Sequence, residues 1–215
     1  MLQSEDFMKK IVFLLITIIV LCGCEKRISR SYVDVLSQID GKWGCVDELG
    51  NEVIPALYDF KFSFCDGIAK VSKKGKYGWI DENGNEVIPC IYDFAFDFSQ
   101  DMASVKKDGK YGYIDKNGNN VIEFHYDFAG MFNEGMACVC KDGKWGWIDK
   151  DGAEKIKLMY DGVSFELENG LTCVKKENKY GCIDRDGNVI IDFIYDENDI
   201  YDALIKNARM VENAN

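Results

Sequence analysis

Acidic side chains recur beside glycines along the chain, a pattern that raises the question of calcium binding. The pattern Asp-x-Asn/Asp-Gly occurs at Asp81–Gly84, Asp115–Gly118, Asp149–Gly152 and Asp184–Gly187. Calcium needs about six to eight converging oxygen ligands, which an EF-hand loop supplies with a glycine at its sixth position and a glutamate at its twelfth. Neither feature fits these segments. Asp or Asn before Gly is also the composition of a tight turn, so we expect turns here and no metal site.

Three cysteines lie on one face of the predicted strands: Cys138, Cys140 and Cys173. A zinc site would need a fourth ligand and Cys-x₂₋₄-Cys spacing, whereas these residues offer Cys-x-Cys and a distant third thiol. The chain has nine cysteines, and seven remain beyond Cys24. An odd number does not suggest a scaffold built on disulfides. We expect most of these thiols to fill small apolar spaces, without a metal or cofactor.

His125 is the only histidine of the chain. In the repeating pattern described below it takes the place of four apolar residues: Leu57, Ile91, Met159 and Ile194. We therefore expect a partly buried side chain rather than a base or a metal ligand. It lies in no nucleophile motif, and the sequence predicts no catalytic residues and no enzyme activity.

Aromatic residues recur at positions i and i+2, so their side chains share one face of a strand. The six residues are Tyr77, Trp79, Tyr111, Tyr113, Trp145 and Trp147. If exposed, they are candidate ligand-binding residues that could stack on sugars or peptides. If buried, they pack across strands as core residues. The exposure of Trp79 and Trp147 distinguishes the two interpretations.

The N-terminal segment has the pattern of an export signal. Lys9 and Lys10 precede an apolar run, Ile11–Leu21, which is shorter than the ~20 residues that a membrane-spanning helix needs. The following Leu-Cys-Gly-Cys resembles a bacterial lipobox, in which Cys24 would carry the lipid. The alternatives are an uncleaved anchor or a plain secretory signal. Met8 is an alternative start, because Met1–Phe7 contains acidic residues where a signal is normally basic.

The elements that position these residues follow a repeat. A Lys-aromatic-Gly motif returns at spacings of 34, 34, 34 and 35 residues, at Lys42–Gly44, Lys76–Gly78, Lys110–Gly112, Lys144–Gly146 and Lys179–Gly181. Five Tyr-Asp pairs keep the same spacings. A fixed period of this size indicates a repeat architecture, in which each copy buries its apolar face against its neighbours.

One copy, residues 76–109, reads as three strands. We expect strands at Lys76–Asp81, at Glu86–Ile88 (ended by Pro89) and at Met102–Lys107, with Asn-Gly and Asp-Gly turns between them and a looser aromatic segment at Tyr92–Asp101. Each strand would pair with its sequence neighbours in a continuous antiparallel meander. A helical repeat is excluded, because turn-forming glycines interrupt any sustained 3.6-residue period.

The third strand of each copy has two kinds of side chain. Ala103 and Val105 are small or β-branched and are expected to face inwards, whereas Ser104 and Lys106 are expected to face outwards. The corresponding residues of other copies, Ser72, Cys138, Cys140 and Cys173, are expected to face outwards too. At the ends of the array, 33–35 would add an extra strand. Ile200–Met210 would form a short helix or an irregular cap.

The recurring text, for example Lys144–Gly152 (KWGWIDKDG), resembles the WG (KWG) repeat family of bacterial proteins. The resemblance extends from Gly41 to about residue 201 and includes Ile-Asp, a Gly turn, Val-Ile-Pro, Tyr-Asp and Gly-x-Ala-x-Val. Copies depart from it where Glu123, Lys157 and Asp192 replace the proline. The resemblance implies a repeat-built extracytoplasmic or scaffold protein, and it implies no catalytic residues.

The sequence thus predicts an all-β protein of five tandem 34-residue repeats in an antiparallel meander array, either open and solenoid-like or closed into a ring. The expected parts are a lipoprotein signal peptide (1–23), a tether (24–31), the repeat domain (32–200) and a C-terminal cap or tail (201–215).

The formal net charge of −11 bears on the partners. An acidic surface repels nucleic acids and anionic lipid headgroups, so the acyl chains on Cys24 would hold the protein on the membrane. We expect an envelope protein that faces the periplasm or the exterior and binds another protein without catalysis. A glycan-binding or cell-wall-binding module that uses exposed aromatic residues is the alternative.

Overall fold

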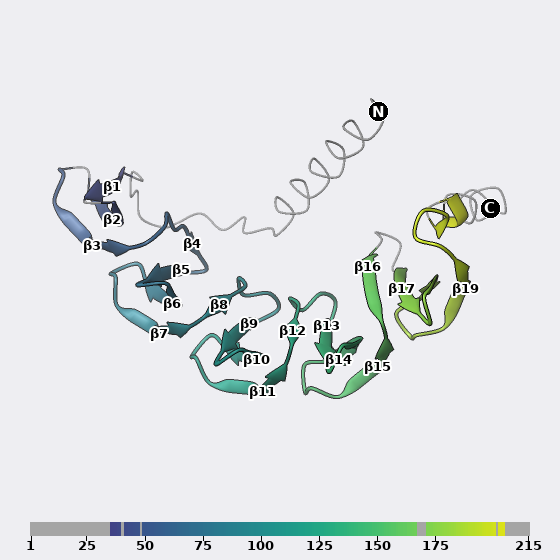
Figure 1. Cartoon of the computed structure of the whole chain (residues 1–215). Helices are drawn as coiled ribbons and strands as arrows, with labels where there is room; N and C mark the ends of the chain where they lie inside the picture. Colours follow the sequence, from purple (N-terminus) through teal and green to yellow (C-terminus); the bar gives the residue numbers. More distant parts are fainter. Residues whose placement is uncertain (1–34, 40, 48, 167–170, 201, 205–215) are drawn as a thin grey trace, which may run out of the picture. The chain divides into compact units, whose positions relative to one another are not determined.

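The computed structural model describes residues 35–39, 41–47, 49–166, 171–200 and 202–204 (Figure 1). Almost all of this part is β-structure. The strands are β1 Val35–Ile39, β2 Lys42–Val46, β3 Glu52–Tyr58, β4 Phe64–Cys65, β5 Ile68–Lys73, β6 Lys76–Asp81, β7 Glu86–Tyr92, β8 Phe94–Ala95, β9 Met102–Lys107, β10 Lys110–Asp115, β11 Asn120–Tyr126, β12 Phe128–Ala129, β13 Met136–Lys141, β14 Lys144–Asp149, β15 Glu154–Tyr160, β16 Gly162–Glu166, β17 Thr172–Lys176, β18 Lys179–Ile183 and β19 Val189–Tyr195.

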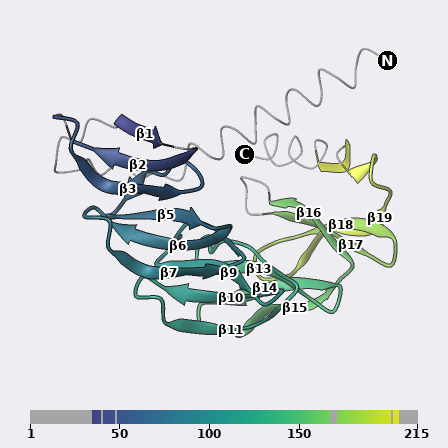
Figure 2. The same cartoon turned by 60° about the vertical axis from the view of Figure 1, so that its left-hand side comes forward.

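These strands form five separate sheets in which every strand lies beside its sequence neighbour. We name them sheet A (β1–β3), sheet B (β4–β7), sheet C (β8–β11), sheet D (β12–β15) and sheet E (β16–β19). The strands of one sheet lie side by side in both views, as β9, β10 and β11 show clearly (Figure 2). The predicted all-β repeat array with antiparallel pairing is confirmed.

The meander is interrupted once per repeat, which the sequence analysis did not predict. After each of the first four Tyr-Asp pairs the chain enters a new sheet: Asp127 N donates to Cys140 O of sheet D at 2.8 Å, and Asp93 N donates to Lys106 O of sheet C at 2.8 Å. The short strands β8 and β12 follow directly, in a segment that the sequence suggested was irregular. A two-residue strand carries too little alternation to be recognised from sequence.

The chain divides into two compact units, residues 1–71 with 80–85 and residues 72–79 with 86–215. The first unit contains sheet A. The second contains sheets C, D and E, and the candidate site described below lies within it.

The glycine of each Lys-aromatic-Gly motif lies where the return strand comes closest. A Cβ atom on Gly112 would lie 2.6 Å from the carbonyl oxygen of Ile122, and one on Gly181 would lie 2.6 Å from that of Ile191. The register shifts across Gly112, between Tyr111 and Tyr113, and again between Tyr113 and Ile114, which marks a β-bulge in the strand pair; sheet E shows the same two shifts, across Gly181 and after Cys182. Only glycine allows this backbone approach.

The return strands also pass through the position where Pro89 was expected to end them. Strand β7 continues from Glu86 to Tyr92, because β7 is the last strand of its sheet. A proline on an edge strand leaves no ladder hydrogen bond unmade. The expected end at Ile88 was therefore wrong.

The core lies between successive sheets of the second unit. One cluster joins sheets C and D through Tyr113, Tyr126, Phe132 and Ile148, and another joins sheets D and E through Trp147, Ile156 and Val174. Both faces of the inner strands are therefore covered.

The expected outward face of the third strand was accordingly wrong in several copies. Ser72, Ser104, Cys140 and Cys173 are all buried. Ser104 lies in sheet C, and its hydroxyl donates to Ala129 O in sheet D at 2.7 Å, which satisfies a polar group inside the interface.

The ends of the described array differ from its middle. Strand β1 pairs antiparallel with β2, so an extra strand does precede the first motif, but it spans Val35–Ile39 and includes only Val35 of the expected 33–35; residues 33 and 34 lie outside the described part. At the other end, helical residues at Ile200 and 202–204 follow β19, and Ile200 is fully buried against sheet E. The helical alternative for the C-terminal cap is correct over these residues.

Candidate functional site

The six aromatic residues proposed from the sequence separate into two sets. Trp79, Tyr113 and Trp147 are 2%, 0% and 5% exposed and belong to the packing between sheets. Tyr113 contacts Phe132 at 4.8 Å between ring centroids and donates its hydroxyl proton to Gly130 O at 2.7 Å. These three rings present no open face to a ligand.

The other three residues, Tyr77, Tyr111 and Trp145, are half-buried and contact Phe94 and Phe128. Ring contacts run from Tyr77 to Phe94 (5.9 Å), Phe94 to Tyr111 (6.4 Å), Tyr111 to Phe128 (5.7 Å) and Phe128 to Trp145 (5.4 Å). We name this set, together with Phe96 beside Phe94 and Phe128, the aromatic row. It crosses from β6 through sheet C to sheet D.

Strand register explains how the row forms. Phe94 on β8 and Tyr111 on β10 both lie opposite Lys106, and Phe128 on β12 and Trp145 on β14 both lie opposite Cys140. Two aromatic residues thus flank one central residue in each sheet. Between sheets, Phe94 contacts Tyr77 of β6, and Tyr111 contacts Phe128 of sheet D. The sequence signal was present in Phe94 and Phe128, the residues that directly follow the Tyr-Asp pairs.

Charges are also fixed along the row. Lys106 Nζ lies 5.3 Å from the centroid of the Tyr111 ring, a cation–π contact. Of the six aromatic-row residues, Phe94 is the most open at 36% exposure. The row is therefore a partly exposed apolar strip.

The lysine of each Lys-aromatic-Gly motif forms an ion pair with the aspartate of the Tyr-Asp pair. Lys110 Nζ lies 2.5 Å from Asp127 Oδ1, and the same contact joins the other pairs, Lys42–Asp59, Lys76–Asp93, Lys144–Asp161 and Lys179–Asp196. Asp127 Oδ2 also accepts from Asp142 N in the next hairpin turn. The Lys110 hydrogen bond is the main reason that the pKa of Asp127 lies below its usual value. At Lys110 and Asp127 the two motifs thus fasten sheet C to sheet D.

The Asp-x-Asn-Gly segments are turns, as the sequence predicted. Asp115 Oδ1 accepts from Asn117 N at 2.9 Å and from Asn119 N at 2.8 Å, and its Oδ2 accepts from the Asn119 side chain at 2.8 Å. Asp81 and Asp184 repeat this pattern. The carboxylates thus close their own turns, and no group of three or more metal-binding side chains gathers within the described residues.

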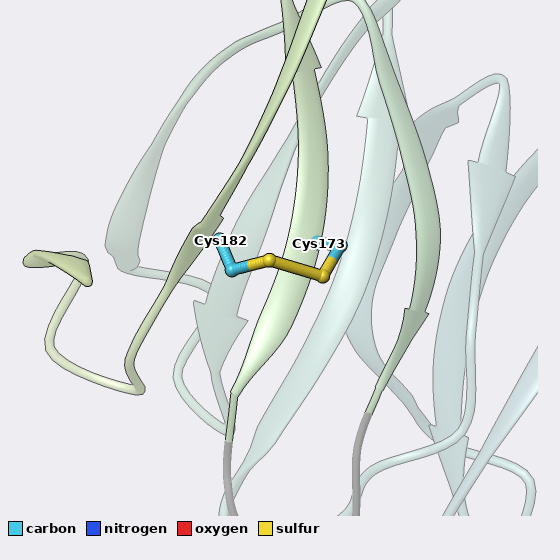
Figure 3. The surroundings of a disulfide bond; sticks show 2 residues. All are labelled: Cys173 and Cys182. Carbon is cyan, nitrogen blue, oxygen red and sulfur yellow. A yellow bond between two sulfur atoms is a disulfide. The ribbon is translucent and has the colours of Figure 1, made fainter. Parts of the chain in front are cut away.

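The cysteines do not all act as small fillers. Cys173 on β17 and Cys182 on β18 form a disulfide, with their Cα atoms 4.1 Å apart (Figure 3). Cys65 is disulfide-bonded as well, whereas Cys138 and Cys140 keep their thiols. Burial is the main reason that the pKa of Cys140 is raised, which makes its thiolate scarce.

His125 lies on the edge strand β11, partly buried beside Tyr126, with ring centroids 4.2 Å apart. Burial is the largest cause that lowers its pKa. Burial thus favours the neutral imidazole, in line with the apolar residues at the same position of other repeats.

The segment with Cys24 and the expected signal peptide, the tether, and most of the expected tail lie outside the described residues. Within the described part, no helix combines the length and hydrophobicity that crossing a membrane requires.

Solved structures with similar backbones are distant in sequence. Hsv2 of Kluyveromyces lactis, in its complete loop 6CD form, is 9% identical at a TM-score of 0.42, and the match covers 70% of this chain and 56% of that one. PorZ of Porphyromonas gingivalis, a bacterial surface component of the type-IX secretion system, is 8% identical at a TM-score of 0.40, with coverages of 72% and 24%. The chain spans about half the length of the Hsv2 structures that it matches.

No curated protein matches the chain. The model of the WG containing repeat matches five times in succession, at residues 43–77, 77–111, 111–145, 145–180 and 180–202. These matches follow one another from the first Lys-aromatic-Gly motif to the C-terminal cap and cover most of the chain, which therefore belongs to the WG containing repeat family.

Proposed function

We propose that this chain is a lipid-anchored WG-repeat protein outside the cytoplasm that binds another protein without catalysing a reaction. The WG-repeat β domain by itself suggests a binding or scaffold module. The observation that carries the proposal is the aromatic row, a strip of partly exposed rings on the repeats. Tyr, Trp and Phe are enriched at the centres of protein interfaces, and a few such residues supply most of the binding energy.

The tilt of the rings favours a protein over a glycan. The ring planes of Tyr77 and Phe94 meet at 60°, those of Phe94 and Tyr111 at 65°, and those of Phe128 and Trp145 at 44°. Neighbouring rings are edge-on or tilted to one another, so the row does not form a flat platform on which sugar rings could stack in series. An irregular apolar strip suits the side chains of a protein partner.

The net charge defines the partner further. A chain of charge −11 is attracted to a basic surface and repelled by anionic polymers and lipids. We therefore expect a partner with lysine or arginine around an apolar centre. The same charge gives the protein no electrostatic attraction to an anionic bilayer, so the lipid on Cys24 would supply the membrane affinity.

A photo-crosslinking amino acid tests the binding surface in the intact, membrane-bound protein. The probe is placed at Phe94 in the row and, as a matched control, at Val121, an exposed apolar residue of the same sheet on the edge strand β11. We expect a protease-sensitive adduct from Phe94 and none from Val121. An adduct that only polysaccharide-degrading enzymes remove would support the glycan alternative, and equal or absent labelling at the two positions would contradict the proposal.

Metabolic labelling with a palmitate analogue tests the anchor. We expect the wild type and Cys22→Ala to be labelled and to fractionate with membranes, and Cys24→Ala to lose both properties. Cys22 is the matched control because it lies two residues before Cys24. Labelling of Cys24→Ala would exclude this residue as the lipid attachment site.

A further inference from the structure

One position differs between the repeats in an informative way: the residue that follows the aromatic residue of the Lys-aromatic-Gly motif by two places on the same strand. Three middle copies fill it with Trp79, Tyr113 and Trp147, and the last copy fills it with Cys182. Opposite these residues on the preceding strand, Ser104 faces Tyr113, Cys138 faces Trp147 and Cys173 faces Cys182. The last sheet thus has two cysteines where sheets C and D have one small residue and one large ring.

The rings of the middle copies fill the space towards the next sheet. Tyr113 contacts Phe132, and Trp147 belongs to the cluster that joins sheet D to Val174 and Ile183 of sheet E. In the described chain no sheet follows sheet E. The Cys173–Cys182 pair packs instead against Ile200, Ala203 and Leu204 of the helical segment after β19.

Both sulfur-bearing residues are fully buried, at 0% exposure. Two thiols fill much less volume than a thiol and an indole, so a reduced pair leaves the end of the core thinly packed. A covalent link between β17 and β18 replaces the lost packing by restricting the unfolded chain. The position of the bond supports this role, because Cys173 and Cys182 lie directly opposite each other on paired antiparallel strands, where the two sulfur atoms are within bonding reach.

We propose that oxidation of Cys173 and Cys182 completes sheet E, so that this end of the array reaches its stable form only in an oxidising compartment. A disulfide-bearing oxidant supplies the chemistry. One cysteine thiolate attacks a sulfur of the oxidant to form a mixed disulfide; the second thiolate then displaces the oxidant, which leaves as a dithiol. The two cysteines lose two protons and two electrons in total, and the oxidant gains them.

Cys45 provides an internal comparison. It occupies the position of Cys182 in the first copy, but it lies in register with Leu36 on β1 rather than with a second cysteine. A cysteine at this position is therefore not enough to form a disulfide between the two strands. The last copy differs because Cys173 lies directly opposite Cys182.

Hydrogen exchange on the full chain tests the proposal, after unfolding and refolding with or without a reducing agent. Without the agent, peptide mapping is expected to give one Cys173–Cys182 crosslinked peptide. With it, we expect amides of β17, β18 and residues 202–204 to exchange about tenfold faster or more, while those of β9, β10 and β13 change little. Alkylation of both cysteines in the oxidised protein, or equal exchange in the two states, would overturn the proposal.

Two substitutions separate the covalent link from general effects of losing a cysteine. Cys182→Trp recreates the Cys138–Trp147 pair of sheet D and is expected to make exchange in sheet E insensitive to the reducing agent. Cys138→Ser recreates the Ser104 of sheet C and is expected to leave the response of sheet E as in the wild type. A Cys138→Ser variant that abolishes this response would assign it to another thiol. If Cys182→Trp does not fold, the wild-type comparison still decides the outcome.

Discussion

At the scale of single residues, one glycine per repeat is required by a close backbone approach rather than by a turn. A Cβ on Gly112 would lie 2.6 Å from Ile122 O and 3.1 Å from the carbonyl carbon of Glu123. Backbone atoms of a paired strand cannot rotate away as the end of a flexible side chain can. Any larger residue must displace the return strand and disturb the bulge that aims Tyr111 and Tyr113.

We expect Gly112→Ala to lower the free energy of unfolding by about 3 kcal/mol, the upper range for overpacking. The matched control is Gly109→Ala, in the hairpin turn beside it. Gly109 has φ of +84° and no neighbouring atom within 4 Å of a Cβ, so alanine there would cost only the strain of a left-handed backbone, about 1–2 kcal/mol. Urea unfolding measures both. A larger cost at Gly109 would contradict the close-approach argument.

The turn aspartates predict a loss of stability in acid. The pKa of Asp115 is lowered from 3.8, chiefly by the hydrogen bond from the Asn119 side chain, with backbone donors Asn119 and Asn117 adding to it. A carboxyl group whose pKa is depressed by folding stabilises the protein above its unfolded pKa, and this contribution is lost as pH falls through the folded value. The free energy of unfolding should therefore decrease below about pH 4.

Asp115→Asn tests the assignment, because an amide keeps an acceptor oxygen but does not titrate. We expect its urea midpoint to fall less steeply than that of the wild type between about pH 5 and about pH 2. Parallel curves for the two proteins would show that Asp115 does not contribute to the acid sensitivity.

At the scale of elements, the last strand of each sheet carries a residue that discourages further pairing. The residues at this position are Pro55, Pro89, Glu123, Lys157 and Asp192, and all are exposed. Proline and charge are two ways in which natural proteins protect an edge strand. Glu123, Lys157 and Asp192, which depart from the proline of the family pattern, therefore protect the edge strand by charge instead.

Strand β19 needs this protection most, because Ile190 and Ile194 on either side of Asp192 are 43% and 65% exposed. We expect Asp192→Val to make the protein self-associate by edge-to-edge pairing, seen as a higher sedimentation coefficient that rises with concentration. Asp186→Val is the matched control, since it removes the same charge from an exposed turn residue outside any strand. Equal association of both variants would assign the effect to net charge alone.

The strands and turns of one repeat can be predicted from the sequence, whereas the packing of one sheet on the next cannot. The 34-residue period, the Asp-Gly hairpins and the strands around Lys76–Asp81 follow from local patterns and were predicted correctly. The division into separate sheets depends on contacts between segments far apart, such as Asp127 with Lys110 and the Asp142 turn. The aromatic row and the burial of Trp79 depend on the same packing between sheets. Local periodicity therefore could not separate exposed from buried rings.

At the scale of the whole molecule, the second unit is held together by contacts between successive sheets. The turn glycines show the spacing: a Cβ on Gly152 in sheet D would lie 3.6 Å from Ile122 of sheet C, and one on Gly187 in sheet E would lie 3.6 Å from Ile156 of sheet D. The two core clusters join the same neighbours. Stability in such a chain is close to a sum of sheets and interfaces.

A chain that ends at residue 161 tests this additivity, because it lacks sheet E and everything after it. We expect sheets C and D to remain folded, since the interface between them, with Tyr113, Phe132 and Ile148, stays intact. Amides of β14 and β15 should exchange faster than in the wild type, because Trp147 and Ile156 lose the sheet that covers them. Exchange in β9 and β10 should change less, because these strands lie one interface further away. A chain that ends at residue 204 keeps the Ile200 contact and serves as the control. Loss of protection in all strands of sheets C and D at once would mean that the second unit folds as one cooperative body rather than as an array.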